Sequence, residues 1–336
     1  MSQSIFSYGL TGLVGAALSL PAVSLLLALI LVMGIVTFTR SPNTDRRLAR
    51  LSDEAAMAVD ARYTRERRAL GISALVVIVI FMVENIVRGY FLNMADVVSW
   101  WRFAIPIFVA FVGLGLLLAV IRFGGTVRPA QPAVLGSRRT WTTFGPRAGL
   151  VGAGVAVVAL LVTTITAGLA SSPDTEGRYI YLEIPIPNES IDPIRPWFYG
   201  WAYGVPVLAC LVALTAVTLV VLHRNAARPF LRAETAGVEQ TARSGIAAGA
   251  VQVATAGVLL TLAGAWRFIA ASGSGSQLTV QGDTPQTGTY EVAWQYAEFA
   301  AIAGWLAPVL EIAAFVLLLL VARQLRRTPV RDQLTA

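Results

Sequence analysis

Residues 15–38 read GAALSLPAVSLLLALILVMGIVTF, an apolar stretch without a charged side chain. A stretch of this length, coiled as a helix, crosses a hydrocarbon core of about 30 Å. Similar stretches recur along the chain, which is 56% hydrophobic and only 13% charged, where a soluble domain has about 25% charged residues. The sequence therefore predicts an all-α, polytopic membrane protein with about seven transmembrane helices. The predicted spans are 15–38, 70–91, 99–121, 148–170, 199–222, 246–270 and 301–322.

The arginines predict the orientation of these spans. No basic residue precedes the first span, which argues for an anchor and against a cleaved signal peptide. Eight arginines follow it within 39–69, so we expect that connection to be a cytoplasmic loop and the N-terminus to lie outside. With strict alternation, 21 of the 26 arginines fall on the cytoplasmic side, as does the C-terminus. Loops 171–198 and 271–300, which carry more acidic than basic residues, are predicted to be extracytoplasmic.

The basic residues also bear on location and partners. All 26 are arginine, and the chain is rich in Ala, Gly and Val, which is typical of a bacterium with a GC-rich genome. We therefore expect a multi-pass protein of a bacterial plasma membrane. Because the arginines lie beside the spans, anionic lipid head groups at the cytoplasmic face explain the pI of about 10.1 better than nucleic acid does. The predicted partners are the lipid bilayer and those head groups.

The outer loops and one inner segment have the marks of ordered structure. Seven of the eight tryptophans fall at or beyond the outer ends of spans, which predicts a small cap packed over the helices. Residues 179–184 alternate in polarity, and 277–280 with 289–292 flank a turn, so the cap is expected to contain short β-strands. Segment 43–68 has apolar residues at helical spacing. It predicts either an amphipathic helix at the membrane surface or against a partner, or a solvated helix continuing the second span.

A repeat is visible in the spans that run from outside to inside. Each has a proline in its outer part and a second one 21 or 23 residues later, the first of each pair being Pro21, Pro106, Pro206 and Pro308. The chain thus divides into one leading helix and three helical hairpins, 68–129, 147–229 and 243–329. A proline within a helix kinks it. Four kinks at similar depth would open a cavity to the outside, unless packing fills the space.

Ionisable residues inside the predicted spans are the candidate site, because they are costly in a membrane and functional by default. The candidate polar pocket comprises Glu84, Arg88, Arg102, Arg267 and Glu311. One interpretation is a pocket for an anionic or zwitterionic group; the other is an ion-pair network that fixes helix register. Glu311 is expected to face the bundle interior near an arginine or a polar cavity. Helix rise places it roughly 13 Å below Arg267, which predicts a kink or a bridging water between them.

Motifs of catalysis are missing from the sequence. It has no GxSxG, HExxH or P-loop pattern. A single cysteine and a single histidine exclude a disulfide framework, a thiolate metal site and a bis-histidine haem within the chain, and the lack of lysine excludes a retinal Schiff base. We therefore predict no catalytic residue, cofactor or metal.

Two functional hypotheses follow. The first is a non-enzymatic membrane subunit or sensor-like partner of an envelope or transport system, which contacts another protein through the outer loops or through segment 43–68. The second is a stand-alone small-solute permease with an outward-facing pocket around Glu311.

Overall fold

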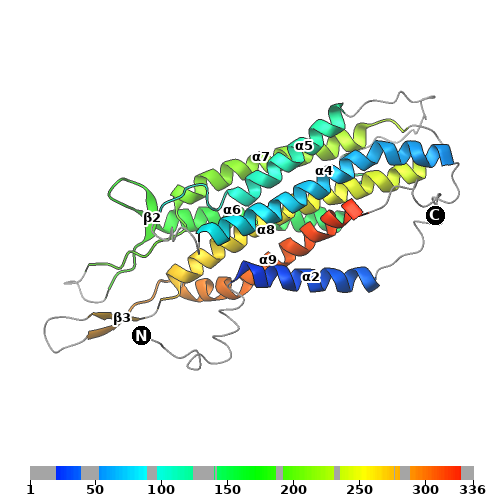
Figure 1. Ribbon diagram of the computed structural model, residues 1–336. Helices are drawn as coiled ribbons and strands as arrows, with labels where there is room; N and C mark the ends of the chain where they lie inside the picture. The colour runs from blue at the N-terminus through cyan, green and yellow to red at the C-terminus, as the bar shows by residue number, and fades with distance from the viewer. Residues whose placement is uncertain are drawn as a thin grey trace.

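A computed structural model describes residues 20–38, 53–88, 97–123, 140, 142–186, 192–230, 235–275, 277–280 and 288–326. Within those residues, seven helices are long and apolar enough to cross a membrane, and they lie side by side as a bundle (Figure 1). The predicted all-α polytopic fold is confirmed. The helices are α2 (Pro21–Phe38), α4 (Asp53–Ile86), α5 (Ile105–Phe123), α6 (Arg147–Ala170), α7 (Trp201–Ala227), α8 (Ala236–Gly273) and α9 (Ala297–Ala322), which a 3-10 turn, η4 (Arg323–Arg326), extends.

Helix α8 is the centre of the bundle. It packs on α9, α6, α5, α7 and α4. In its most apolar stretch 78% of the residues are buried inside the protein, whereas this share is 39% or less in every other span of the described part. Small residues allow this enclosure: a Cβ added to Gly257 would lie 2.9 Å from the Cβ of Ala110 in α5. Lipid tails are as apolar as leucine, so close packing of this kind is what holds membrane helices together.

Helix α2 lies at the edge of the bundle and packs mainly on α9. Its only buried residues are Ser24 and Ala28. It is the leading helix of the predicted arrangement, and the chain then runs through α4 and α5, α6 and α7, and α8 and α9 as neighbouring pairs. The equivalence of these three hairpins stays a prediction.

The four prolines do not act alike. Pro21 is the first residue of α2 and Pro106 the second of α5. In the first turn of a helix the missing N–H has no partner to lose, so proline starts a helix there without kinking it. Only Pro206 and Pro308 of this set lie inside their helices. The expectation of four interior kinks is therefore wrong for α2 and α5.

Two helices extend well beyond their predicted apolar spans. Helix α4 begins at Asp53, so the predicted loop 39–69 is helical from there on and continues the second span; residues 43–52 lie outside the described part. Helix α8 begins at Ala236 rather than 246. Both extensions carry charged residues that are paired in the structure, so the helices do not end where the apolar run ends.

The cap consists of two antiparallel hairpins at one end of the bundle (Figure 1). Strand β1 (Ser171–Pro173) pairs with β2 (Tyr179–Leu182), and β3 (Gln277–Val280) pairs with β4 (Gly288–Glu291). The strands expected near 179–184, 277–280 and 289–292 are confirmed. Strand β1 was not predicted, because three residues containing a proline have no alternating pattern.

Aromatic residues join this cap to the helices. Phe198 and Tyr199 are fully buried. Phe198 packs edge-on against Trp294 with ring centroids 5.3 Å apart, and Tyr181 packs on Trp197 at 5.5 Å. The cap is therefore a packed continuation of the bundle.

Candidate functional site

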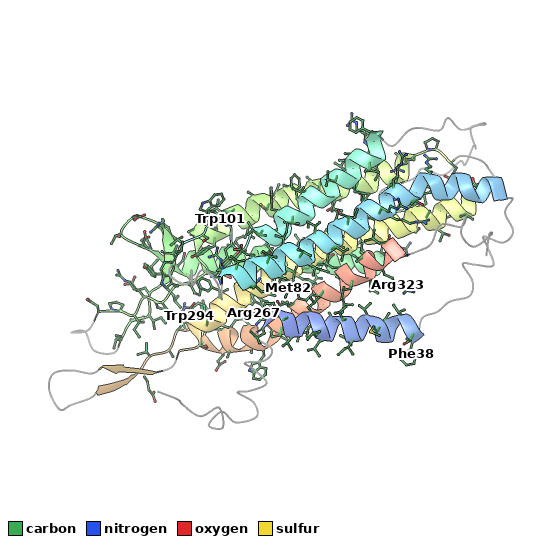
Figure 2. The ribbon with its side chains drawn as sticks, in the orientation of Figure 1. Phe38, Met82, Trp101, Arg267, Trp294 and Arg323 are labelled. Carbon is green, nitrogen blue, oxygen red and sulfur yellow. The ribbon has the colours of Figure 1, made fainter. Side chains whose placement is uncertain are left out.

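All five residues of the candidate polar pocket line one cavity of about 250 Å³. Glu84 and Arg88 come from the end of α4, Arg102 from the turn before α5, Arg267 from α8 and Glu311 from α9. Figure 2 shows Arg267 and Trp101 toward the end that carries the β-hairpins, and Arg323 toward the opposite end. We call this space the polar cavity.

Glu311 lies in the bundle interior with 1% of its side chain exposed. It forms an ion pair with Arg267, and the Ser24 hydroxyl donates a hydrogen bond to it at 3.1 Å. The expected interior position is confirmed, whereas the expected separation from Arg267 is wrong. The reason is the register of the two helices: Gly304 in α9 lies against Ala270 in α8. Arg267 is therefore only about one helical turn, roughly 6 Å, from the level of Glu311, which a guanidinium can reach.

The second ion pair of the polar cavity lies within a single helix. Arg88 Nε donates to Glu84 Oε1 at 3.0 Å, with 11% and 28% of the two side chains exposed. This pair therefore does not join two helices, and among the five residues only Arg267 with Glu311 does so. Arg88 Nη1 is buried and has no hydrogen-bond partner among the described residues. One nitrogen of this guanidinium thus has unused N–H donors.

Arg102 differs from the other two arginines. No carboxylate of the described residues lies within salt-bridge distance of it. Its guanidinium instead lies over the rings of Phe103 and Phe268, 5.0 and 5.2 Å from their centroids. An arginine still keeps its proton in such surroundings, so Arg102 brings a positive charge to the polar cavity.

The turn that carries Arg102 is held from two sides. The Thr261 hydroxyl of α8 donates to the carbonyl of Phe103 at 2.9 Å. The Phe103 ring is 5% exposed and packs edge-on against Tyr199 and Tyr203, at 5.1 and 5.3 Å. Tyr199 lies in the connection between β2 and α7, next to Phe198, whose N–H donates to the Ile180 carbonyl of β2 at 2.7 Å. The turn is therefore linked to the cap through this connection.

The polar cavity ends inside the bundle. Its deepest lining residues on α8 are Leu260 and Thr261. One turn further along, Gly257 meets α5 so closely that an added Cβ would lie 3.1 Å from the Pro106 carbonyl oxygen. Helices α5 and α8 are therefore in direct contact below the polar cavity.

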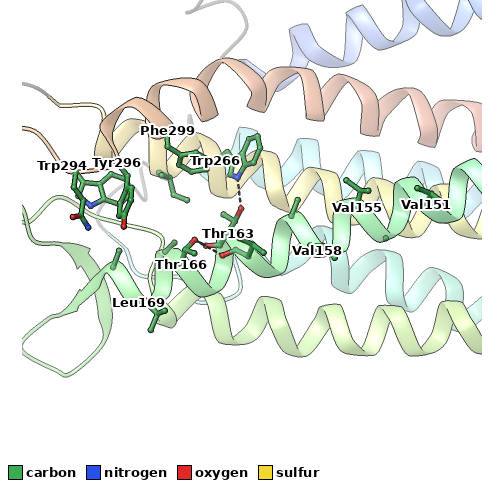
Figure 3. Close-up of a pocket in the computed structure, with 17 residues that line it drawn as sticks. Val151, Val155, Val158, Thr163, Thr166, Leu169, Trp266, Trp294, Tyr296 and Phe299 are labelled. Atoms are coloured by element: carbon green, nitrogen blue, oxygen red, sulfur yellow. Dashed lines mark hydrogen bonds between the residues drawn. The ribbon is translucent and has the colours of Figure 1, made fainter.

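A second hollow lies on another side of α8, between α6 and the start of α9 (Figure 3). This apolar groove has a volume of about 1070 Å³ and shares no lining residue with the polar cavity. The polar groups on its α6 and α8 walls bond within the protein: Trp266 Nε1 donates to Thr163 Oγ1 at 3.0 Å, and Thr166 Oγ1 donates to the Val162 carbonyl at 2.8 Å. The groove offers a surface suited to hydrocarbon.

A further group of buried charges lies where α8 begins, at the end of the bundle opposite the cap. Its residues were not among the candidate site residues predicted from the sequence. We call it the α8-start cluster, and its members are Tyr63, Glu66, Arg228, Glu239 and Arg243. One signal was available in the sequence: Glu239 and Arg243 are four residues apart and thus share a helix face. Placing the start of the span at 246 left both outside the helix.

Arg243 is the central member of the α8-start cluster, with none of its side chain exposed. It donates to the carbonyls of Arg228 and Pro229 at 2.7 and 2.8 Å, and to the Tyr63 hydroxyl at 3.1 Å. Its carboxylate partner, Glu239, lies at 3.4 Å. Since these groups belong to α4, the α7–α8 connection and α8, the cluster holds three parts of the chain together.

The two residues with distinctive chemistry lie away from the polar cavity. Cys210 is half-buried within α7, and His223 is exposed at its end. No three His, Cys, Asp or Glu side chains of the described ranges gather closely enough to hold a metal ion. Comparisons with protein-family models, with curated proteins and with solved structures found no match to this chain.

Proposed function

We propose that this integral membrane protein is a non-enzymatic component of an envelope or transport system, a membrane subunit or sensor-like partner, that recognises a small solute in the polar cavity. The observation that carries the proposal is the cavity itself. Five ionisable side chains from α4, α8, α9 and the turn before α5 surround one space. Ionisable groups inside a bundle of membrane helices are retained against a considerable energetic penalty, which favours a role for them.

Recognition is favoured over transport by the way in which the polar cavity ends. The α5–α8 contact at Gly257 lies below it, and α8 is enclosed by its neighbours along most of its length. A solute bound beside Arg102 would also touch the turn whose Phe103 packs on Tyr199, and the neighbouring Phe198 is hydrogen-bonded to β2 of the cap. A solute in the cavity could thus shift the position of the cap through these packed residues, as a sensor-like subunit needs.

We further propose that the cap lies outside the cytoplasm of a bacterial cell and is the surface that contacts a partner protein. The arginine distribution supports this orientation. Trp100 and Trp101, beside Arg102 in the turn before α5, have 56% and 44% of their surface exposed, and Tyr179 of β2 has 44%. Exposed tryptophan and tyrosine are typical both of membrane interfaces and of protein contacts.

The alternative function, a stand-alone permease, has one observation in its favour: the polar cavity reaches Glu311, deep in α9. A permease needs a second state in which the α5–α8 contact opens. Binding and uptake of solutes, measured with the purified chain reconstituted into liposomes, distinguish the two functions. Saturable binding without uptake, together with a stoichiometric partner in native-membrane purifications, is the result we expect. Solute uptake by the chain alone would favour the permease, and failure to bind any small solute would refute both.

A further inference from the structure

We propose that the polar cavity selects a small organic anion with a single carboxylate, which Arg102 and Arg88 bind. This inference rests on the proposed function, because it names the class of solute that the same cavity takes. It moves the binding role from Glu311, around which the sequence hypothesis was centred, to two arginines at the other side of the cavity.

The first argument is charge balance. The cavity is lined by three arginines and two glutamates, and each glutamate already has an arginine partner: Glu84 pairs with Arg88, and Glu311 pairs with Arg267. The remaining positive charge is that of Arg102. A half-buried guanidinium with no counter-ion among the described residues is unfavourable within a membrane-spanning bundle. One negative charge on a ligand would compensate it, whereas a cation would add to the imbalance.

The second argument is unused hydrogen-bonding capacity. Arg88 Nη1 is buried and has no partner in the part of the chain that the structure describes, although its Nε is bonded to Glu84. The Arg102 guanidinium lies over two aromatic rings and forms no hydrogen bond or ion pair with the described residues. A carboxylate has two oxygens that accept such N–H donors, and a guanidinium binds them in a fork-like geometry. The ligand group that these two arginines lack is therefore an acceptor.

The third argument concerns size and the rest of the wall. A cavity of about 250 Å³ is smaller than the 300–1,000 Å³ common for drug-sized ligands. Phe81, Phe103 and Phe268 belong to the apolar part of its lining, together with smaller apolar residues such as Ile105 and Leu260. These dimensions suit a carboxylate on a short apolar body. A zwitterion fits less well, because its ammonium group would have to compete with an arginine for each carboxylate of the cavity.

The test is ligand binding by the full-length chain in detergent, measured by calorimetry and by the melting temperature. The probes are propionate, propylamine and propanol, which share a short apolar body and differ in charge, and inorganic phosphate. We expect propionate to bind and the amine and the alcohol not to bind. Arg102→Gln and Arg88→Gln should each weaken propionate binding at least tenfold, Arg102→Lys should weaken it less, and Arg122→Gln, at the far end of α5, should leave it unchanged.

The outcomes separate this inference from the function beneath it. Binding of propanol or propylamine in preference to propionate overturns the anion assignment and leaves a solute-recognition role standing. Propionate binding that survives Arg102→Gln and Arg88→Gln, with Arg122→Gln as reference, also overturns it. A lipid phosphate is the competing source of an anion. Equal propionate affinity in nanodiscs with and without phosphatidylglycerol supports a carboxylate solute, whereas displacement by that lipid, or tighter binding of inorganic phosphate, contradicts it.

Discussion

The Ser24 hydroxyl in α2 donates a 3.1 Å hydrogen bond to the carboxylate of Glu311 in α9, residues 287 positions apart in the chain. Both side chains are buried, with Ser24 0% and Glu311 1% exposed. Ser24 and Ala28 are the buried residues of α2, so this bond attaches the leading helix to the rest of the bundle at its buried face.

Ser24→Ala should therefore loosen α2. A hydrogen bond to a charged group contributes about 1.5 kcal/mol or more to stability, so we expect a lower melting temperature in detergent and earlier proteolysis near α2. Thr37→Ala is the matched control, because the Thr37 hydroxyl is exposed and bonds only within its own helix, to the Gly34 carbonyl. Equal melting temperatures for the two variants would show that the Ser24 bond does not hold α2.

Arg243 offers a larger effect at the other end of the bundle. Arg243→Met removes donors to two carbonyls and to Tyr63, and it removes the guanidinium that lies 3.4 Å from the buried Glu239. Removing one partner of a buried ion pair costs about 3–5 kcal/mol, so we expect this variant to lose most of its folded yield. Arg243→Lys keeps the charge without the planar fork and should be intermediate.

The control for Arg243 is Arg224→Gln, because Arg224 is exposed at the end of α7. Exposed substitutions usually change stability by about 0.5 kcal/mol or less. Unfolding monitored by tryptophan fluorescence in a denaturing-detergent titration ranks the variants. If Arg243→Met unfolds at the same detergent fraction as Arg224→Gln, the α8-start cluster does not stabilise the fold.

The fold was largely predictable because its signals are local. An apolar run near 20 residues, such as 15–38, requires a helix in a bilayer whatever surrounds it. The strands at 277–280 and 289–292 were also predictable from alternation across a turn. Helix ends were not: α8 starts ten residues before its predicted span. The helix includes Glu239 and Arg243 because these two side chains pair inside the protein. Such a tertiary contact cannot be read from the hydropathy of the sequence.

The candidate site was predictable in its members and not in its pairing. Charge within an apolar run was enough to select Glu84, Arg88, Arg102, Arg267 and Glu311. Their partners depend on helix register, which the Gly304–Ala270 contact sets for α8 and α9. Sequence spacing alone placed Arg267 and Glu311 too far apart, because it put the outer end of the sixth span and the outer end of the seventh span at the same membrane plane.

Gly257 tests whether close packing of α8 on α5 matters. Gly257→Val would bring a Cβ to 2.9 Å from the Ala110 Cβ, closer than real contacts allow. Overpacking of this kind costs about 1–3 kcal/mol, and it would also disturb the floor of the polar cavity. Gly245→Val on the same helix is the control, since a Cβ there meets nothing within 4 Å. A Gly257→Val protein as stable as the Gly245→Val protein would mean that α5 and α8 have room to separate.

The orientation of the chain is decided by labelling cysteines in intact cells. In a Cys210→Ala background, one cysteine replaces the exposed Thr175 in the cap, and another replaces Arg224 at the end of α7, on the arginine-rich side. The bias of arginine toward the cytoplasm predicts that a membrane-impermeant maleimide labels Thr175→Cys in intact cells and Arg224→Cys only after lysis. Labelling of both after lysis controls for accessibility. Because the helices alternate in direction, these two sites fix every span of the bundle. Labelling of Arg224→Cys in intact cells would reverse the topology and place the polar cavity at the cytoplasmic end of the bundle.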